Sequence, residues 1–100
     1  MTDRIVAVFP CRKDEVAAME EGFRASLGDT RAYDGCLDIE VTFEAETSTF
    51  VVIQEWESVA HYDRYLAWRV ENGLYRMFDR VLEGGHDAFR VYRLGKKPEL

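Results

Sequence analysis

Two tyrosines and an arginine in the middle of the chain have the spacing of neighbours on one side of a helix. Tyr62, Tyr65 and Arg69 stand at i, i+3 and i+7, which places them on one flank of a helix. A guanidinium there can stabilise a substrate phenolate, and a tyrosine can orient an aromatic ring. The alternative is boundary packing with the hydroxyls in water and a surface arginine. These three residues are the best candidates for a pocket, with Tyr65 and Arg69 as candidate catalytic residues and Tyr62 as a candidate binding residue.

The sequence does not identify a general base for this pocket. The tyrosine phenol ordinarily has a pKa of about 10, and arginine stays protonated. His61 titrates near neutral pH, but the helical wheel turns it away from the apolar stripe. Glu20 lies at the edge of the apolar stripe of an earlier helix, where burial would raise its pKa; a solvated edge carboxylate is the alternative. His86 follows two glycines and is expected in a solvated loop.

The remaining candidates are aromatic rings and thiols. Phe23 and Trp56 are candidate substrate-binding side chains, as is Glu20, and core packing is the alternative interpretation for both rings. Trp68 lies opposite the apolar stripe and is expected to pack under residues 74–83 or against a partner subunit. The two cysteines, at positions 11 and 36, lack metal-site spacing and are interpreted as reduced thiols. We therefore predict no metal site at the cysteines.

A strand and a capped helix position the tyrosines. Residues 50–56 alternate with apolar side chains on both faces, which is typical of a strand covered on both sides. Ser58 is suited to cap the following helix, whose apolar stripe is Val59, Tyr62, Leu66 and Val70. The flanking pattern predicts strands at 4–11, 36–43 and 87–94, helices at 13–27 and 74–83, a loop at 28–35 with Gly28 as helix C-cap, a hairpin connection at 44–49 and a break at 71–73.

The predicted order βαββαβ gives one antiparallel sheet. Two right-handed crossovers place the strands in the order 4-1-3-2 with both helices on one face, a ferredoxin-like α+β fold. Gly22, in the middle of the first helix, is expected to allow close approach to the sheet. The first and third strands are apolar on both faces, so the face without helices needs a partner. We predict a homodimer packed sheet to sheet.

Composition limits the classes of function. One hundred residues fit a single domain, which we place at 1–95 with a frayed tail at 96–100. The net charge of −6 and the lack of any Lys/Arg run longer than two argue against nucleic-acid binding. No apolar run approaches the ~18 residues of a membrane span, so no membrane partner is expected and the protein is interpreted as soluble and cytoplasmic.

One family pattern runs through these elements. Gly35-Cys36-Leu37, an acid-rich hairpin, and Phe50-Val-Val-Ile-Gln-Glu-Trp56-Glu-Ser58 with Ala60 and a ring at position 65 resemble the antibiotic biosynthesis monooxygenase domain. The resemblance implies a dimeric α+β barrel with a pocket between sheet and helices. It also implies oxidation of phenolic or quinol-like substrates by molecular oxygen, often without metal or flavin. The strand-one Asn of the haem-degrading branch is missing, and no His lies between 62 and 85, so haem degradation is not expected.

Three functional hypotheses follow. The first is a cofactor-independent monooxygenase of a small aromatic substrate, with Tyr65 standing at the position of the family's functional ring. The second is a non-catalytic small-molecule binding or regulatory module, since ferredoxin-like dimers also serve as ligand sensors. The third is an isomerase or hydrolase, which would need Glu20 or His61 inside the cavity.

Overall fold

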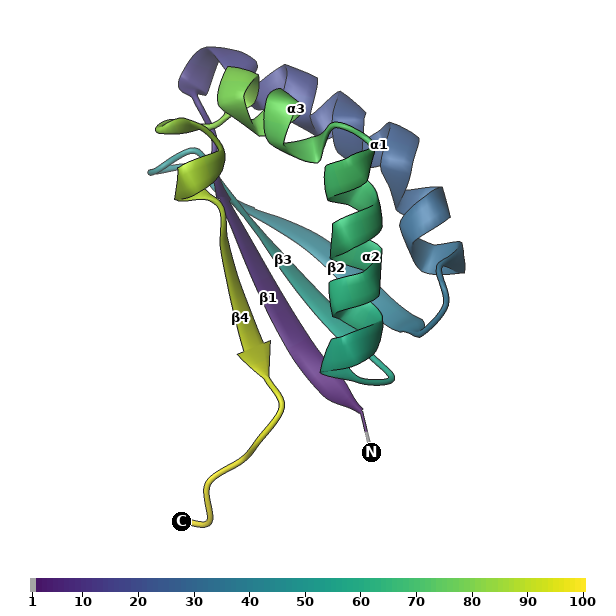
Figure 1. Ribbon diagram of the computed structural model, residues 1–100. Coiled ribbons are helices and arrows are strands. Elements are labelled where there is room, and N and C mark those ends of the chain that lie inside the picture. Colours follow the sequence, from purple (N-terminus) through teal and green to yellow (C-terminus); the bar gives the residue numbers. More distant parts are fainter. Residues whose placement is uncertain (1) are drawn as a thin grey trace.

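A computed structural model describes residues 2–100. It contains a four-stranded sheet with three α-helices and two short 3-10 helices (Figure 1). In chain order the elements are β1 (Asp3–Pro10), a 3-10 helix (Lys13–Glu15), α1 (Val16–Ala32), β2 (Cys36–Glu44), β3 (Thr49–Trp56), α2 (Val59–Glu71), α3 (Leu74–Val81), a second 3-10 helix (Gly85–Ala88) and β4 (Arg90–Leu94).

The sheet has the predicted topology. Its strand order is β2-β3-β1-β4 with every neighbouring pair antiparallel, which is the order 4-1-3-2 read from the other edge. β1 and β3 occupy the centre, and β2 lies at an edge. The ferredoxin-like α+β class is therefore confirmed.

The two faces of the sheet differ in what covers them. All three α-helices lie against one face (Figure 1), and the strand residues pointing to it are buried, as Ile5, Phe50 and Trp56 illustrate. The opposite face carries half-buried aliphatic side chains from the central strands and two side chains of β4, Tyr92 and Leu94, that are more than half exposed. The pattern of central strands that are apolar on both faces is thus present in the structure.

The α2 region follows the sequence signals closely. The Ser58 hydroxyl accepts a hydrogen bond from the backbone N–H of His61 at 3.2 Å, as an N-cap does. α2 ends at Glu71, and Gly73 adopts a left-handed φ of 95° between α2 and α3. None of the helices within residues 2–100 is long and apolar enough to cross a bilayer.

Several expected boundaries were wrong. α1 does not end at Gly28 but continues to Ala32, so most of the expected 28–35 loop is helical. Gly22 does not touch the sheet, because a Cβ built there meets no atom within 4 Å. β4 begins at Arg90 rather than at residue 87, since Gly85–Ala88 forms a 3-10 helix. A register shift between Cys36 and Asp38 interrupts the alternation of β2 and leaves Leu37 half exposed.

Candidate functional site

A cavity of about 240 Å³ lies between the sheet and the helices. Its floor includes Ala7 and Val52 from the central strands, and its walls come from α1, α2 and α3. Among the lining residues, Gly22 and Asn72 are exposed, which marks where the cavity reaches the surface. The lining is mostly apolar, with a few polar groups, as expected of a small-molecule site. The cavity lining includes four of the six residues predicted for the site: Phe23, Tyr62, Tyr65 and Arg69.

Arg69 lies at the centre of a hydrogen-bond network that joins α2 to α1. Its Nε donates to the Tyr65 hydroxyl at 2.9 Å. Its Nη2 donates to the Thr30 hydroxyl at 2.9 Å and to the Ser26 carbonyl at 3.0 Å. The guanidinium also lies over the Trp68 ring, 4.7 Å from the ring centroid, which is cation–π geometry. The arginine is therefore held in one orientation.

Two hydroxyl groups complete this network. The Thr30 hydroxyl donates to the Ser26 carbonyl at 3.3 Å. In that arrangement the Tyr65 hydroxyl, 2.7 Å from Thr30, donates to Thr30 while it accepts from Arg69. Tyr65 thereby positions the guanidinium. The two Nη1 hydrogens of Arg69 have no acceptor among residues 2–100.

A second polar group lies on the sheet side of the cavity. Gln54 is 5% exposed and accepts from the indole Nε1 of Trp56 at 2.9 Å through its Oε1. Because an indole N–H only donates, this bond fixes the amide orientation and leaves the Gln54 NH₂ group as a donor for other partners. Tyr62, also in the lining, is almost fully buried, and this burial, together with the neighbouring Tyr65, raises the pKa of its phenol. Tyr62 is therefore neutral and unsuited to act as a base.

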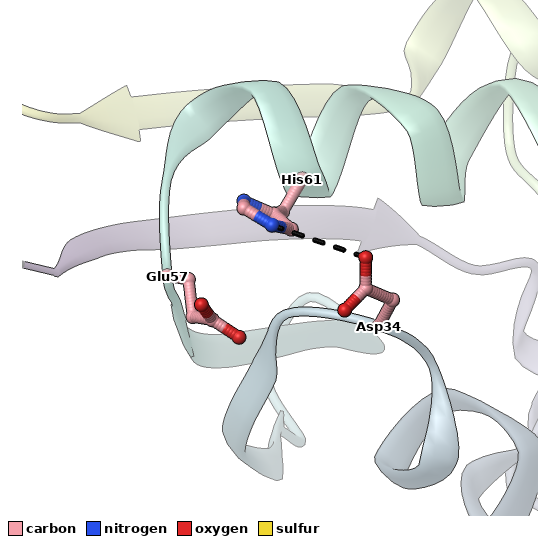
Figure 2. Close-up of side chains that lie close together, drawn as sticks. All are labelled: Asp34, Glu57 and His61. Carbon is pink, nitrogen blue, oxygen red and sulfur yellow. Dashed lines mark ion pairs between the residues drawn. The ribbon is translucent and has the colours of Figure 1, made fainter.

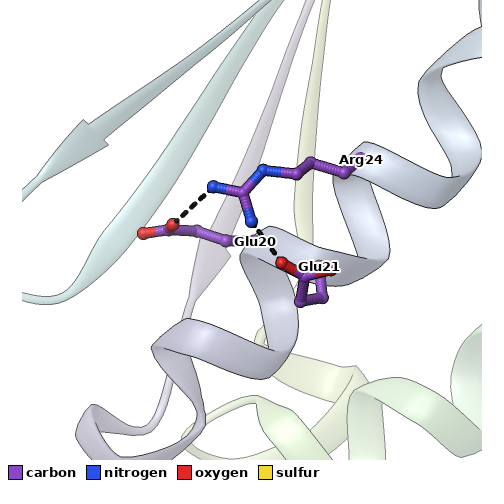
Figure 3. Close-up of polar contacts among 3 residues, drawn as sticks. All are labelled: Glu20, Glu21 and Arg24. Atoms are coloured by element: carbon purple, nitrogen blue, oxygen red, sulfur yellow. Dashed lines mark hydrogen bonds and ion pairs between the residues drawn. The ribbon is translucent and has the colours of Figure 1, made fainter.

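Trp56 and Glu20, the other two predicted binding residues, lie outside the lining. Trp56 is fully buried behind Tyr65, with ring centroids 5.1 Å apart. Glu20 lies on α1, where it pairs with Arg24 at 3.4 Å beside Glu21 (Figure 3). Its side chain is 46% exposed. The structure thus places Glu20 in the solvated position that was the alternative.

His61 also lies away from the cavity, as the helical wheel indicates. Its Nδ1 is 2.7 Å from the Ser58 hydroxyl, and its Nε2 is 3.9 Å from a carboxylate oxygen of Asp34. Together with Glu57 these residues bring three side chains of metal-ligand type within 4.8 Å of one another (Figure 2). Arg64 already lies 3.9 Å from the same oxygen of Asp34, so the protein supplies a cation to this exposed cluster. An isomerase or hydrolase using Glu20 or His61 has no support in this geometry.

Two other predicted placements can be compared with the structure. The aromatic neighbours of Trp68, Tyr33 and Tyr65, do not belong to residues 74–83, and packing against a partner subunit stays a prediction. Trp68 packs on Tyr33, just beyond the end of α1, with ring centroids 5.3 Å apart, and against Arg69. His86 stacks on Tyr75 at 4.8 Å and bonds to the Asp79 carboxylate at 2.7 Å, while its side chain is 41% exposed.

The two cysteines are free thiols at opposite ends of the sheet. Cys11 is buried at the end of β1, and its thiol donates to the Val81 carbonyl at 3.5 Å. Burial raises the pKa of both the Cys11 and the Cys36 thiol. Neither is activated as a nucleophile.

Sequence reasoning missed Thr30 and Gln54. Thr30 was assigned to a loop, although Met19, Phe23 and Thr30 continue one helical stripe. Gln54 is the polar residue between Val52 and Trp56 on the helix-facing side of a buried strand. A lone polar side chain at such a position was the signal that could have found it.

Comparisons with known proteins agree with this fold. The sequence profile of the family described as "Antibiotic biosynthesis monooxygenase" matches residues 4–68. No curated protein sequence is significantly similar to the chain. Among solved structures, a conserved protein from Methanosarcina mazei Go1 superposes with a TM-score of 0.80 at 17% identity, covering 97% of this chain and 94% of that one. A protein from Mycobacterium tuberculosis gives 0.70 at 23%, covering 99% and 98%. A structure titled "antibiotic biosynthesis monooxygenase" gives 0.77 at 18%, covering 98% and 100%. These likenesses show the fold.

Proposed function

Because the chain belongs to the antibiotic biosynthesis monooxygenase family, we propose that it is a cofactor-independent monooxygenase acting on a small phenol- or quinol-like substrate with molecular oxygen. The observation that carries the proposal is the cavity itself. It is mostly apolar and encloses one fixed cation, Arg69, beside the Tyr62 and Tyr65 rings. An electron-rich aromatic anion would find there both a hydrophobic enclosure and stabilisation of its charge.

The proposed chemistry needs no external reductant. Oxidation of an activated CH₂ group, as in an anthrone, by one O₂ gives a carbonyl group and one water, so the substrate supplies all the electrons. The substrate must first lose a proton to become electron-rich enough to react with oxygen. Arg69 would favour the resulting anion, and Tyr65 would hold the guanidinium in place. Tyr62 and Phe23 would contact the ring.

One observation favours a second candidate, a non-catalytic binding or regulatory module. Within the described residues, the lining contains no Asp, Glu or His, so no protein base is in place to remove the substrate proton. A sensor needs only a cavity that can hold its ligand, and the lack of a base in the lining does not count against that role.

Oxygen uptake tests the proposal directly. Metal-stripped protein is mixed with a panel of quinols, anthrones and naphthols, and uptake is compared with the spontaneous rate. We expect uptake that falls in Arg69→Ala and Tyr65→Phe but not in Arg64→Ala, which removes an exposed arginine from the same helix. Uptake that is unchanged in the cavity variants would contradict the site assignment. Thermal stabilisation without uptake for any compound would favour the binding module.

We further propose that the protein is a homodimer formed through the open sheet face. Val6, Val8, Val51 and Ile53 form an aliphatic strip at its centre, flanked by Tyr92 and Leu94. Contact with a second copy would remove this apolar surface from water. Light scattering at micromolar concentration should give about twice the chain's mass, and Ile53→Lys should give a folded monomer. A monomeric wild-type protein would contradict the proposal.

A further inference from the structure

We propose that the cavity binds its ligand as an anion: a small, largely apolar aromatic molecule with one carboxylate or phenolate, held by the Nη1 donors of Arg69. The inference rests on the proposed small-molecule site but not on oxygen chemistry. It therefore applies equally to an oxygenase and to a binding module.

The first support is the charge of the lining. Arg69 is the one ionised side chain among the described lining residues. No carboxylate of residues 2–100 lies within salt-bridge distance of it. The cavity thus carries a single positive charge in a protein whose net charge is −6. A partly buried charge without a partner is unfavourable, and an anionic ligand would relieve that cost.

The second support is how the guanidinium is held. The groups that orient it are the Tyr65 hydroxyl, the Thr30 hydroxyl and the Ser26 carbonyl, all of them neutral. They use three of its five N–H donors and leave its charge uncompensated. The Nη1 pair remains available in a fixed direction. A donor oriented before binding loses little freedom when an oxyanion arrives, which favours binding.

The third support is the character and size of the rest of the site. At about 240 Å³, the cavity is smaller than the roughly 300–1,000 Å³ typical of sites for drug-sized ligands. Its walls include Phe9, Phe23 and Phe89, which suit a ring. A one- or two-ring aromatic acid satisfies the apolar walls and the arginine together.

Calorimetric titration at pH 7 with three probes of similar shape tests the inference. The probes are 2-naphthoate, which is ionised, 2-naphthamide, which is neutral, and 2-naphthol, which is neutral in water but becomes a phenolate if the site ionises it. We expect naphthoate to bind about 10- to 100-fold more tightly than naphthamide, the effect of one charge-assisted hydrogen bond. The preference should disappear in Arg69→Gln and persist in Arg64→Gln. If the natural anion is a phenolate, the pH at which naphthol shows the phenolate absorption band should fall by about 1–2 units on binding, and that shift should disappear in Arg69→Gln.

The outcomes separate this inference from the proposed function. Equal binding of naphthoate and naphthamide, together with a naphthol titration that does not shift on binding, would overturn the anion inference and leave an aromatic site. A naphthoate preference that survives in Arg69→Gln would also overturn it. Because Arg69→Gln removes hydrogen bonds to α1 and could fail to fold, the comparison of probes on the wild-type protein decides the question by itself. Failure of all three probes to bind would overturn both proposals.

Discussion

Gly22 offers a test that separates stability from ligand binding. It lies inside α1, it lines the cavity, and a Cβ added there meets no atom within 4 Å. Gly28 lies in the same helix with the same open surroundings but does not line the cavity. A substitution at either position should stabilise the helix, because glycine is unfavourable in a helix interior. Only a substitution at residue 22 should reach the ligand.

A substitution at Gly22 should change stability and ligand affinity in opposite directions. Replacing glycine by alanine in a helix interior contributes about 0.8–1.0 kcal/mol, so Gly22→Ala and Gly28→Ala should each raise the melting temperature by about 4–8 °C in a domain of this size. Gly22→Leu should retain most of that gain and extend four carbons over the cavity. Losing roughly 60 Å² of apolar ligand contact at about 25 cal/mol per Å² weakens binding by about 1.5 kcal/mol, or about tenfold.

The assay pairs thermal melts with titration of the tightest aromatic probe. Gly22→Leu should be more stable than the wild type and bind about tenfold more weakly, whereas Gly28→Leu should be more stable and bind normally. Unchanged affinity in Gly22→Leu would refute the placement of the ligand in this cavity. A loss of stability in both alanine variants would show that the space around α1 is occupied, contrary to the structure.

Three further predictions concern the N-terminal end of α2 and the loop after α3. Gly35→Ala should destabilise the fold by about 2–4 kcal/mol in urea melts, because φ is 92° and a Cβ would lie 2.5 Å from the His61 ring; a loss below about 0.5 kcal/mol would mean that the loop moves freely. Ser58→Ala should remove the cap of α2 and cost about 0.5–2 kcal/mol, while Ser58→Asp should retain most of the stability. Hydrogen bonding to Asp79 raises the pKa of His86, and the backbone N–H and ring of His86 lower the pKa of Asp79. The contribution of His86 to stability should therefore be lost as pH rises through its pKa. The contribution of Asp79 should be lost as pH falls through the Asp79 pKa. An NMR titration in which Asp79→Asn leaves the His86 pKa unchanged would contradict this pairing.

The sheet could be predicted from the sequence because the pattern of apolar residues in a strand indicates whether the strand lies at the edge or at the centre. Alternation in β2 indicated an edge, and apolar side chains on both faces of β1 and β3 indicated the centre. The end of α1 could not be predicted in the same way. Gly28 is a strong local stop signal, but its penalty of about 1 kcal/mol was outweighed by contacts formed farther along the helix. Thr30, for example, is 2% exposed and bonded to Tyr65.

Residues of the candidate site that share one helix could be predicted from their spacing. Residues that other elements bring to the site were missed. Tyr62, Tyr65 and Arg69 share a helix, so their spacing alone indicated proximity. Thr30 approaches them from α1 and Gln54 from β3, and no periodicity within α2 can report those contacts. The consequence is chemical, because Thr30 accepts from Nη2 of Arg69 and lies 2.7 Å from the Tyr65 hydroxyl, while Nη1 keeps no acceptor among residues 2–100.

The lack of a base in the described lining limits which substrates the proposed oxygenase can activate. One charge-assisted hydrogen bond contributes about 1.5–3 kcal/mol, and each pKa unit corresponds to about 1.4 kcal/mol. Arg69 can therefore lower the pKa of a bound phenol by about 1–2 units, from about 10 to about 8–9. A simple phenol would remain mostly protonated at pH 7, and its oxidation should accelerate about tenfold per unit as pH rises from 7 toward 8.

A substrate that is already acidic at neutral pH should instead react at a rate independent of pH over that range. Oxygen uptake measured for both kinds of compound at pH 6 to 9 distinguishes the two regimes. Rapid, pH-independent oxidation of a simple phenol would refute the reasoning, because it would require a base that Arg69 cannot replace.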